Sequence, residues 1–211
     1  RDTVDFLTAA TGPLHVPAFP DIEGIDDFKG TKFHTAEWLD GIDLSDKRVG
    51  IIGSGSTGTQ VISAIANQGV NLKAFIRTPQ WVFPLPNRQF GKMERSIVRA
   101  FPFIGRLAGS FYGWFFERVF AEAVIKQGWQ RKFLSAMCKW HLSRVKDPAL
   151  RAKLTPTDEP LCKRMVMSTL FYPAVARPNV EIVRDGIVRA TEKGLLDESG
   201  RLHELDVIIF A

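Results

Sequence analysis

The chain has 211 residues, of which 45% are hydrophobic and 24% charged, and this composition indicates a folded domain and excludes a disordered segment. Its net charge of +5 comes from 28 basic and 23 acidic residues scattered along the chain, and so weak a basic excess does not predict a nucleic-acid surface. The two cysteines, Cys138 and Cys162, form no CxxC motif and no disulfide framework. We therefore expect no metal site and a reducing, cytoplasmic setting.

Residues 1–46 are predicted to be mainly a connecting segment. An apolar run at residues 5–10 predicts an initial strand, and prolines and glycines follow it at short intervals. Proline and glycine at such intervals forbid a helix and favour an extended segment that lies over another domain.

A β-α-β unit is predicted over residues 47–77. Residues 47–52 and 72–76 are short apolar runs typical of strands. Between them, residues 56–68 have helical periodicity, with Val61, Ile62, Ile65 and Ala66 on one face. The unit has the length of one parallel crossover, so we expect an α/β fold with a Rossmann-like parallel sheet.

A glycine-rich turn joins the first strand of this unit to its helix. In the motif Gly53-x-Gly55-x-x-Gly58, the three glycines would allow a tight turn, a close approach of a pyrophosphate, and close packing of helix on strand. The N–H groups and the dipole at the helix N-terminus favour an anion. A glycine-rich turn without a ligand is the alternative. The expected binding residues of the turn are Gly53, Ser54, Gly55, Ser56, Thr57, Gly58 and Gln60.

The end of the second strand favours NADP(H) over NAD(H). NAD-specific folds place an acidic residue there to bind the ribose 2′-hydroxyl, whereas this chain has Arg77 followed by Thr78. A guanidinium pairs with a 2′-phosphate through charge-assisted hydrogen bonds, and the threonine hydroxyl can add another. An Arg77 that only solvates the end of a strand is the alternative.

Residues 88–154 are predicted to form a helical insertion. Aromatic and basic residues crowd together there with helical spacing, and Asp147 and Pro148 are a typical N-cap and first residue of a last short helix. The apolar residues 107–116 are about half as long as a membrane-spanning helix and are followed by Glu117 and Arg118. They predict a buried or interfacial helix and no transmembrane segment.

The C-terminal part changes to short strands. Strands are predicted at residues 180–183, 187–190 and 207–210, with a hairpin around residues 197–200. This pattern predicts a small antiparallel group beside the parallel sheet. The apolar run at residues 207–211 has no turn after it, so we expect the chain to be a segment of a larger protein.

The spacing Phe28-x-Gly30-x-x-x-His34-x-x-x-Trp38 resembles the fingerprint of the Baeyer–Villiger monooxygenases, a group within the class B flavoprotein monooxygenases. Five further stretches resemble this family in the same order and cover essentially the whole chain. They are AATGPLHVPAFPDIEG, which resembles the segment leaving the FAD domain; GSGSTGTQ, its NADP turn; RTPQW, its 2′-phosphate site; CKRMVMSTLFYP, which carries its active-site arginine; and DVIIFA, the strand that re-enters the FAD domain.

The resemblance implies a role for the fingerprint. In the family it lies where the FAD and NADP domains meet, and its histidine and tryptophan order the linkers as the cofactors shift. Phe28, Gly30, His34 and Trp38 would then couple the domains, and His34 would be neither a metal ligand nor a general base. Judged from the residues alone, a single histidine near aromatic rings is more often a hydrogen-bonded packing residue.

The resemblance also implies a catalytic residue. Arg164 occupies the position of the family's active-site arginine, whose guanidinium would stabilise an anionic oxygen species on the flavin and the oxyanion that forms when it attacks a carbonyl. Lys163 would contact a phosphate or ribose of NADP(H). Without the family, Lys163 and Arg164 are a dibasic pair of the kind found on solvated surfaces.

Three leucines depart from the family's pattern. Leu39 follows Trp38 where proline or aspartate is usual, and Leu161 precedes Cys162 where relatives commonly have glycine. Leu170 replaces an acidic or amide residue. The last two lie near the implied active site, so they bear on substrate preference more than on fold.

The implied protein is an NADPH- and FAD-dependent monooxygenase that uses O2 to convert a ketone or aldehyde into an ester or lactone. The family's FAD-binding GxGxxG is absent, so the fragment alone is expected to bind NADP(H) and to be inactive. Residues 1–46 are expected to be a linker from the FAD domain that carries the fingerprint. Residues 47–87 and 155–206 are expected to form an NADP-binding domain of the two-dinucleotide-domain flavoprotein type, interrupted by the insertion at residues 88–154. Residues 207–211 are expected to start the return strand to the FAD domain.

Three alternatives remain open on sequence. Flavin-containing monooxygenases oxidise soft nitrogen and sulfur atoms, but their fingerprint ends in an aromatic residue other than Trp38. A disulfide reductase of the glutathione reductase type shares the two-domain plan but lacks the insertion and the fingerprint. A non-catalytic Rossmann module that senses NADPH would use the aromatic insertion as a partner or membrane face.

Overall fold

The computed structural model describes residues 5–6, 8, 16–87 and 89–211. The strand predicted at residues 5–10 therefore lies largely outside the described residues, as does the first part of the stretch at residues 9–24 that resembles the segment leaving an FAD domain.

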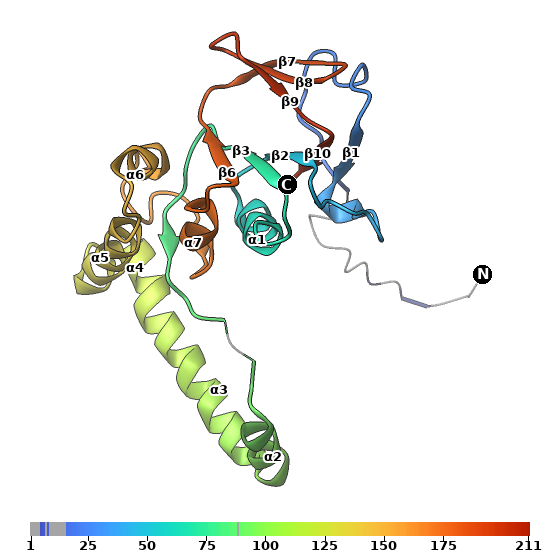
Figure 1. Ribbon diagram of the computed structural model, residues 1–211. Helices are drawn as coiled ribbons and strands as arrows, with labels where there is room; N and C mark the ends of the chain where they lie inside the picture. The colour runs from blue at the N-terminus through green and yellow to red at the C-terminus, as the bar shows by residue number, and fades with distance from the viewer. Residues whose placement is uncertain (1–4, 7, 9–15, 88) are drawn as a thin grey trace.

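A five-stranded parallel sheet forms the centre of the molecule, in the order β1-β10-β2-β3-β6 (Figure 1). The strands are β1 (Thr31–His34), β10 (Val207–Phe210), β2 (Arg48–Ile52), β3 (Asn71–Phe75) and β6 (Val180–Val183). Helix α1 (Ser56–Ile65) connects β2 to β3, so the predicted β-α-β unit is confirmed. The predicted α/β class with a parallel sheet is confirmed as well.

Strand β10 lies where the sequence predicts a strand, at residues 207–210, whereas β1 was not predicted, because residues 31–34 were expected in a connector. The two strands pair in parallel with each other, from Thr31 opposite Val207 to His34 opposite Phe210. β10 also pairs with β2 and so lies inside the sheet. The pairing joins opposite ends of the chain, and local sequence carries no signal for such a contact.

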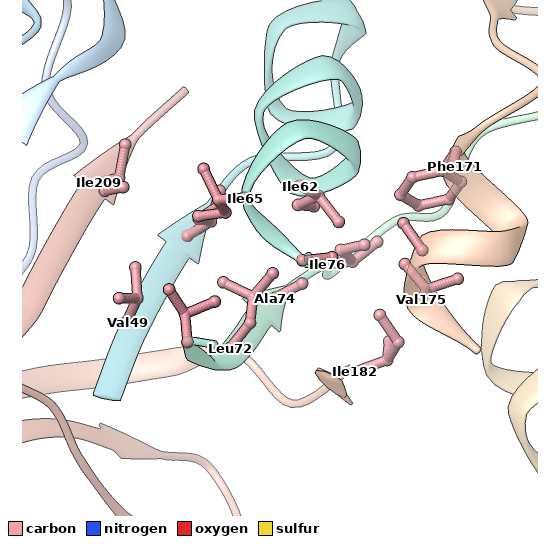
Figure 2. Packing of buried hydrophobic residues seen from close by; sticks show 14 of the residues in the cluster. Val49, Ile62, Ile65, Leu72, Ala74, Ile76, Phe171, Val175, Ile182 and Ile209 are labelled. Atoms are coloured by element: carbon pink, nitrogen blue, oxygen red, sulfur yellow. The ribbon is translucent and has the colours of Figure 1, made fainter. Parts of the chain in front are cut away.

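Both faces of the sheet are covered, as a parallel sheet requires. On one face α1 and α7 (Phe171–Val175) pack on alternate strand residues, as Figure 2 shows for Val49, Leu72, Ala74, Ile182 and Ile209. On the other face a hydrophobic cluster joins the sheet to a second, antiparallel sheet. Its buried members are Ile22, Phe28, Phe75, Val183, Ala190, Leu195, Leu205, Ile208 and Phe210.

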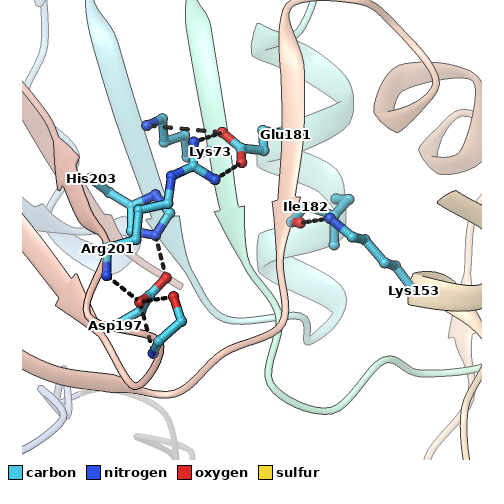
Figure 3. A network of polar contacts seen from close by, with 8 residues as sticks. Lys73, Lys153, Glu181, Ile182, Asp197, Arg201 and His203 are labelled. Atoms are coloured by element: carbon cyan, nitrogen blue, oxygen red, sulfur yellow. Dashed lines mark hydrogen bonds and ion pairs between the residues drawn. The ribbon is translucent and has the colours of Figure 1, made fainter. Parts of the chain in front are cut away.

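The antiparallel sheet has three strands, β7 (Ile187–Thr191), β8 (Gly194–Asp197) and β9 (Leu202–Glu204), which confirms the predicted antiparallel group and its hairpin. Polar contacts also connect it to the parallel sheet (Figure 3). Glu181 of β6 accepts a hydrogen bond from Arg201 at 2.6 Å and lies 3.9 Å from the ammonium group of Lys73 on β3.

The insertion is helical, as predicted. It consists of α2 (Lys92–Ala100), α3 (Pro102–Phe116), the π-helix η2 (Glu117–Ala121), α4 (Glu122–Ile125), α5 (Trp129–Ser143) and α6 (Pro148–Leu154). Asp147 caps α6 by accepting from the N–H of Ala149 at 2.9 Å, with Pro148 in the first turn, which confirms the predicted cap. A short parallel pair, β4 (Val82–Phe83) and β5 (Val166–Met167), links the insertion to the rest of the chain.

Helix α3 projects away from the sheet with α2 at its far end (Figure 1). No residue of α2 or α3 is buried. Of the two alternatives predicted for residues 107–116, the buried helix is therefore wrong, and the interfacial helix stays a prediction. Buried residues begin at Val119, which packs with Phe83, Ala123, Leu134 and Cys138. Among the described residues, no helix is long and apolar enough to cross a membrane.

Candidate functional site

The glycine-rich turn between β2 and α1 has the strained geometry that only glycine accommodates easily. Gly53 has a φ of +126°, and a Cβ there would lie 2.0 Å from the carbonyl oxygen of Ala211. A Cβ on Gly58 would lie 2.5 Å from the carbonyl oxygen of Gly53. Gly53 therefore lets the turn approach the end of β10, and Gly58 lets the start of α1 pack against the turn after β2, as the motif predicts for close helix–strand packing.

Gly55 serves a different purpose, because a Cβ there would meet no heavy atom within 4 Å. Gly55 is the N-cap of α1 and provides no side-chain hydrogen bond to the helix. The first N–H groups of an α-helix have no partner within the helix, and the helix dipole is positive at this end. The open backbone in front of α1 thus fits an anionic group such as a pyrophosphate.

A cavity of about 520 Å³ lies beside this turn, within the size range of small-molecule sites. The structure brings five of the predicted cofactor residues to its wall: Gly53, Ser54, Arg77, Thr78 and Lys163. The hydroxyl of Ser54 donates to the carbonyl oxygen of Thr78 at 3.0 Å, which joins the glycine turn to the end of β3. The guanidinium of Arg77 and the ammonium of Lys163 make this wall cationic.

Lys163 is held at the cavity through Asp158. Its ammonium pairs with the carboxylate of Asp158 at 2.5 Å. The indole N–H of Trp81, which closes the RTPQW stretch, donates to the backbone carbonyl of Asp158 at 2.7 Å. Trp81 therefore fixes the segment that orients Lys163.

The opposite wall was missed by the sequence analysis. It consists of residues at the connector, the loop after β6 and the β8–β9 turn: Pro20, Asp21, Ile22, Asp185, Gly186, Ile187 and Glu198. Glu198 N–H donates to the carbonyl oxygen of Gly186 at 2.9 Å, so the loop and the turn support each other. The available signal was the turn dipeptide Asp185-Gly186 just after β6, because ligands of parallel sheets bind at the carboxyl ends of the strands.

Six predicted cofactor and catalytic residues lie outside the cavity wall, among them Gly55 and Gly58 of the glycine turn. Ser56, Thr57 and Gln60 are exposed in the first turns of α1. Arg164 is also exposed, and no hydrogen bond or ion pair joins it to another described residue. Arg164 therefore follows Lys163 in the chain without sharing its cavity.

The fingerprint residues surround β1. Phe28 is buried between the two sheets, and a Cβ on Gly30 would lie 2.4 Å from the carbonyl oxygen of Asp206, so glycine lets β1 approach β10. His34 ends β1, and its Nδ1 accepts from the N–H of Ala36 at 3.1 Å, which leaves Nε2 as the ring's donor. Trp38 is partly exposed and makes an edge contact with Phe33 at 5.1 Å.

The three departing leucines differ in their surroundings. Leu161 has a φ of +72°, in the left-handed region where glycine is favoured, and this is the position at which the resemblance leads us to expect glycine. Its side chain packs against the cluster around Phe83. Leu39 and Leu170 are exposed.

A larger cavity, of about 660 Å³, lies between α5, α6 and α7. None of the predicted site residues lines it. Its polar groups include His141, whose pKa is lowered by burial, and Tyr172, whose pKa is raised by burial. The glycine turn and the cations Arg77 and Lys163 line the smaller cavity instead.

Comparison with known proteins identifies the family of the chain. Residues 2–211 match the family described as flavin-binding monooxygenase-like. An uncharacterised monooxygenase of Mycobacterium tuberculosis is 47% identical over all 211 residues, which are 42% of its own length. A Baeyer–Villiger monooxygenase of Streptomyces coelicolor is 37% identical over 209 residues, which cover 99% of this chain and 40% of the relative. The chain thus spans less than half the length of these relatives.

Solved structures show the same likeness. The crystal structure of cyclohexanone monooxygenase from Rhodococcus sp. Phi1 bound to NADP+ has a TM-score of 0.81 and 31% identity, covering 96% of this chain and 45% of that one. A structure of OTEMO in complex with FAD and NADP has a TM-score of 0.78 and 33% identity, with the same coverage of 96% and 45%. On its fold, its glycine turn and these matches, the chain belongs to the flavin-binding monooxygenase-like family.

Proposed function

We propose that this chain is the NADP(H)-binding part of a flavin-dependent monooxygenase that inserts one oxygen atom of O2 into a ketone to give an ester or lactone. The observation that carries the proposal is the cavity shared by the glycine turn and the cations Arg77 and Lys163. Relatives named Baeyer–Villiger monooxygenase and the NADP-bound structures support the reaction class. When bound, NADPH supplies a hydride and FAD supplies the chemistry with O2.

In this proposal the chain's own residues bind and orient the nucleotide. The N–H groups at the start of α1 hold the pyrophosphate, with Gly55 allowing its approach. Arg77, Thr78 and Lys163 hold the 2′-phosphate and so select NADP(H) over NAD(H). Both free thiols, Cys138 and Cys162, suit a reducing cytoplasm.

The same proposal gives Arg164 and the fingerprint their roles. Arg164 is free of described partners, so its guanidinium is available to stabilise negative charge at the reacting oxygen and at the carbonyl oxygen of the substrate. Phe28 and Gly30 hold β1 against β10, which places His34 and Trp38 at the edge of the sheet. From there they would contact the FAD-binding part and couple its movement to the NADP(H) site.

Cofactor selection is tested in the complete protein that carries this chain, loaded with FAD. KM for NADPH and for NADH is measured by following flavin reduction. Arg77→Ala removes charge-assisted hydrogen bonds worth about 1.5–3 kcal/mol, so KM for NADPH should rise roughly 10- to 100-fold while KM for NADH stays the same. Lys193→Ala, an exposed cation outside the cavity, is the matched control. Equal effects on both nucleotides would refute the 2′-phosphate role.

The reaction class is tested with a mixed panel of ketones, thioethers and amines in air. Esters from the ketones, lost in Arg164→Ala while flavin reduction by NADPH persists, would establish the role of Arg164. Products limited to N- or S-oxides, or ester formation that survives Arg164→Ala, would leave the fold assignment intact and refute the proposed chemistry. Nucleotide binding without any oxygenated product would instead indicate an NADPH sensor.

A further inference from the structure

The arm formed by α2 (Lys92–Ala100) and α3 (Pro102–Phe116) takes no part in the nucleotide site. It extends away from the sheet (Figure 1), and its residues are all partly or fully exposed. Large apolar side chains are concentrated on it: Met93, Ile97, Val98, Phe101, Phe103, Ile104, Leu107, Phe111, Tyr112, Trp114 and Phe115. An apolar surface of this extent indicates an interaction site.

Four large apolar side chains of α3 share one face. Phe103, Leu107, Phe111 and Trp114 recur at the helical spacing i, i+4, i+8, i+11, and these four are between 53% and 66% exposed. Phe111 also contacts Trp114 and Phe115, with ring centroids 6.2 Å and 6.5 Å apart. The face is therefore a continuous aromatic stripe.

Helix α2 lies on the other side of α3 and leaves this stripe open. Gly105, Gly109 and Gly113 recur every four residues on the opposite side of α3. A Cβ on Gly105 would lie 3.1 Å from a methyl carbon of Val98 in α2, so α2 approaches α3 at Gly105. The aromatic stripe consequently faces away from α2.

The arm is also cationic. Between residues 92 and 116 there are four basic residues, Lys92, Arg95, Arg99 and Arg106, and one acidic residue, Glu94, a net charge of +3. Lys92, Arg95 and Arg99 recur at i, i+3, i+7 on one side of α2, away from Met93 and Ile97. Each helix thus carries apolar and polar sides.

We propose that the arm binds the surface of an anionic lipid bilayer, with the aromatic stripe of α3 buried in the interface and the basic residues of α2 near the head groups. Aromatic and aliphatic residues on one face with lysine and arginine on the other are typical of helices that lie in the membrane plane. The ring of Trp114 in the stripe combines an apolar body with a polar N–H group, which suits the interface. At 15 residues, α3 is too short to span the hydrocarbon core.

Charge favours lipid over a second copy of the chain. Two arms that paired through their stripes would bring together two segments of net charge +3, whereas anionic head groups attract each basic residue by about 1 kcal/mol. The π-helix η2 and the buried Val119 mark the point where the arm joins the packed insertion. Substitutions within the arm should therefore leave the core intact.

The test measures co-sedimentation of the complete protein with vesicles of phosphatidylcholine alone and with vesicles that also contain phosphatidylglycerol. We expect binding to the anionic vesicles and its loss at high salt. Arg95→Gln with Arg99→Gln should weaken binding roughly 30-fold, and Phe111→Ser with Trp114→Ser should abolish it. Matched controls off the arm are Arg189→Gln with Lys193→Gln, and Trp129→Ser. Trp129 is 66% exposed and Trp114 is 58% exposed.

A second measurement does not depend on disruptive variants. Lipids brominated near the head group should quench the fluorescence of the wild-type protein when it binds vesicles. Trp114→Phe should bind the vesicles as well as the wild type yet lose most of the quenching, and Trp129→Phe should keep it. Absence of binding to anionic vesicles would overturn the proposal, because another part of the complete protein would then cover the stripe. The proposal would also be overturned by an oligomer that forms without lipid and is lost in the double variant Phe111→Ser with Trp114→Ser. The stripe would then bind a second copy of the chain.

Discussion

The carboxylate of Asp197 lies 2.7 Å from Nε2 of His203, and both side chains are almost completely excluded from solvent. The other carboxylate oxygen of Asp197 accepts from the hydroxyl of Ser199 at 2.6 Å and from the N–H groups of Ser199 and Arg201 at 3.0 Å and 2.9 Å (Figure 3). The Ser199 hydroxyl and the His203 ring lower the pKa of Asp197 well below its usual range. The ionised carboxylate therefore fixes the β8–β9 turn, whose Glu198 lines the nucleotide cavity.

Asp197→Asn should destabilise the protein in a pH-dependent way. A carboxyl group whose folded-state pKa is lowered contributes stability above its unfolded value, 3.8, and loses that contribution as the pH falls below it. Urea unfolding at a series of pH values should show the wild type more stable than the variant near neutrality, with the difference shrinking in acid. A difference that stays constant with pH would contradict the role of the charge.

A second carboxylate joins β2 to the start of β10. Asp206 accepts from the N–H and the guanidinium of Arg48 at 2.7–3.1 Å, and Arg48 lowers the pKa of Asp206 to about 2. Because the pair is partly exposed, we expect a double-mutant cycle of Arg48→Gln and Asp206→Asn to give a coupling free energy of about 1 kcal/mol. The coupling should vanish as the pH falls from 3.8 towards 2. A coupling free energy that persists below pH 2 would show that it does not depend on the ionised carboxylate of Asp206.

The glycines of the nucleotide turn should separate folding from binding. Gly58→Ala forces a methyl group against the carbonyl oxygen of Gly53 and should lower the free energy of unfolding by about 1–3 kcal/mol. Gly55 has a φ of −67° and open space around it. The substitution Gly55→Ala should therefore leave the free energy of unfolding unchanged. KM for NADPH should nevertheless rise in Gly55→Ala, because the methyl group occupies the approach to α1. Thermal unfolding and flavin-reduction kinetics measure the two effects, and normal NADPH kinetics in Gly55→Ala would exclude a close approach of the pyrophosphate.

The backbone strain at Leu161 can be measured by comparing the stability of two variants. Leu161→Ala and Leu161→Gly both remove the packing against the cluster around Phe83, but only glycine relieves the φ of +72°. The glycine variant should therefore be more stable than the alanine variant by about 1 kcal/mol in chemical unfolding. Equal stability of the two variants would show that the turn relaxes when the side chain is removed.

Trp81 should affect NADPH binding without touching the nucleotide. Trp81→Phe removes the indole donor to the Asp158 carbonyl and so loosens the carboxylate that holds Lys163. KM for NADPH should rise several-fold and KM for NADH should not. The additional substitution Lys163→Ala should then have less effect than it has in the wild type. Additive effects of the two substitutions would show that Trp81 acts independently of Lys163.

The sequence predicts the nucleotide-binding half of the cavity because its signals are local. The glycine motif indicates a nucleotide only when it lies between a strand and a helix. The spacing of the apolar residues on either side of Gly53, Gly55 and Gly58 predicts both elements. The predicted role of Arg77 in binding a 2′-phosphate follows from its position at the end of the next strand. Lys163 was assigned only through the resemblance, since nothing local distinguishes it from a surface lysine.

Other features could not be predicted because they depend on distant contacts. The strand β1 exists only because Thr31–His34 pairs with β10 near the other end of the chain, and the spacing of Phe28 and Gly30 reflects that pairing. The second cavity wall requires the β6–β7 loop and the β8–β9 turn to meet through Gly186 and Glu198. Helical periodicity correctly predicted α3 but carried no information about whether another element covers it.

The position of β10 has a consequence for synthesis on the ribosome. β10 fills the gap between β1 and β2, so both strands emerge with one edge lacking its neighbour. At about 5–20 residues per second, β2 must wait roughly 8–30 s while the approximately 150 residues that separate it from β10 are translated. Throughout that interval Val49 and Ile51 stand on an unpaired strand edge, which is a template for aggregation. The nascent chain should therefore depend on chaperones until β10 is made.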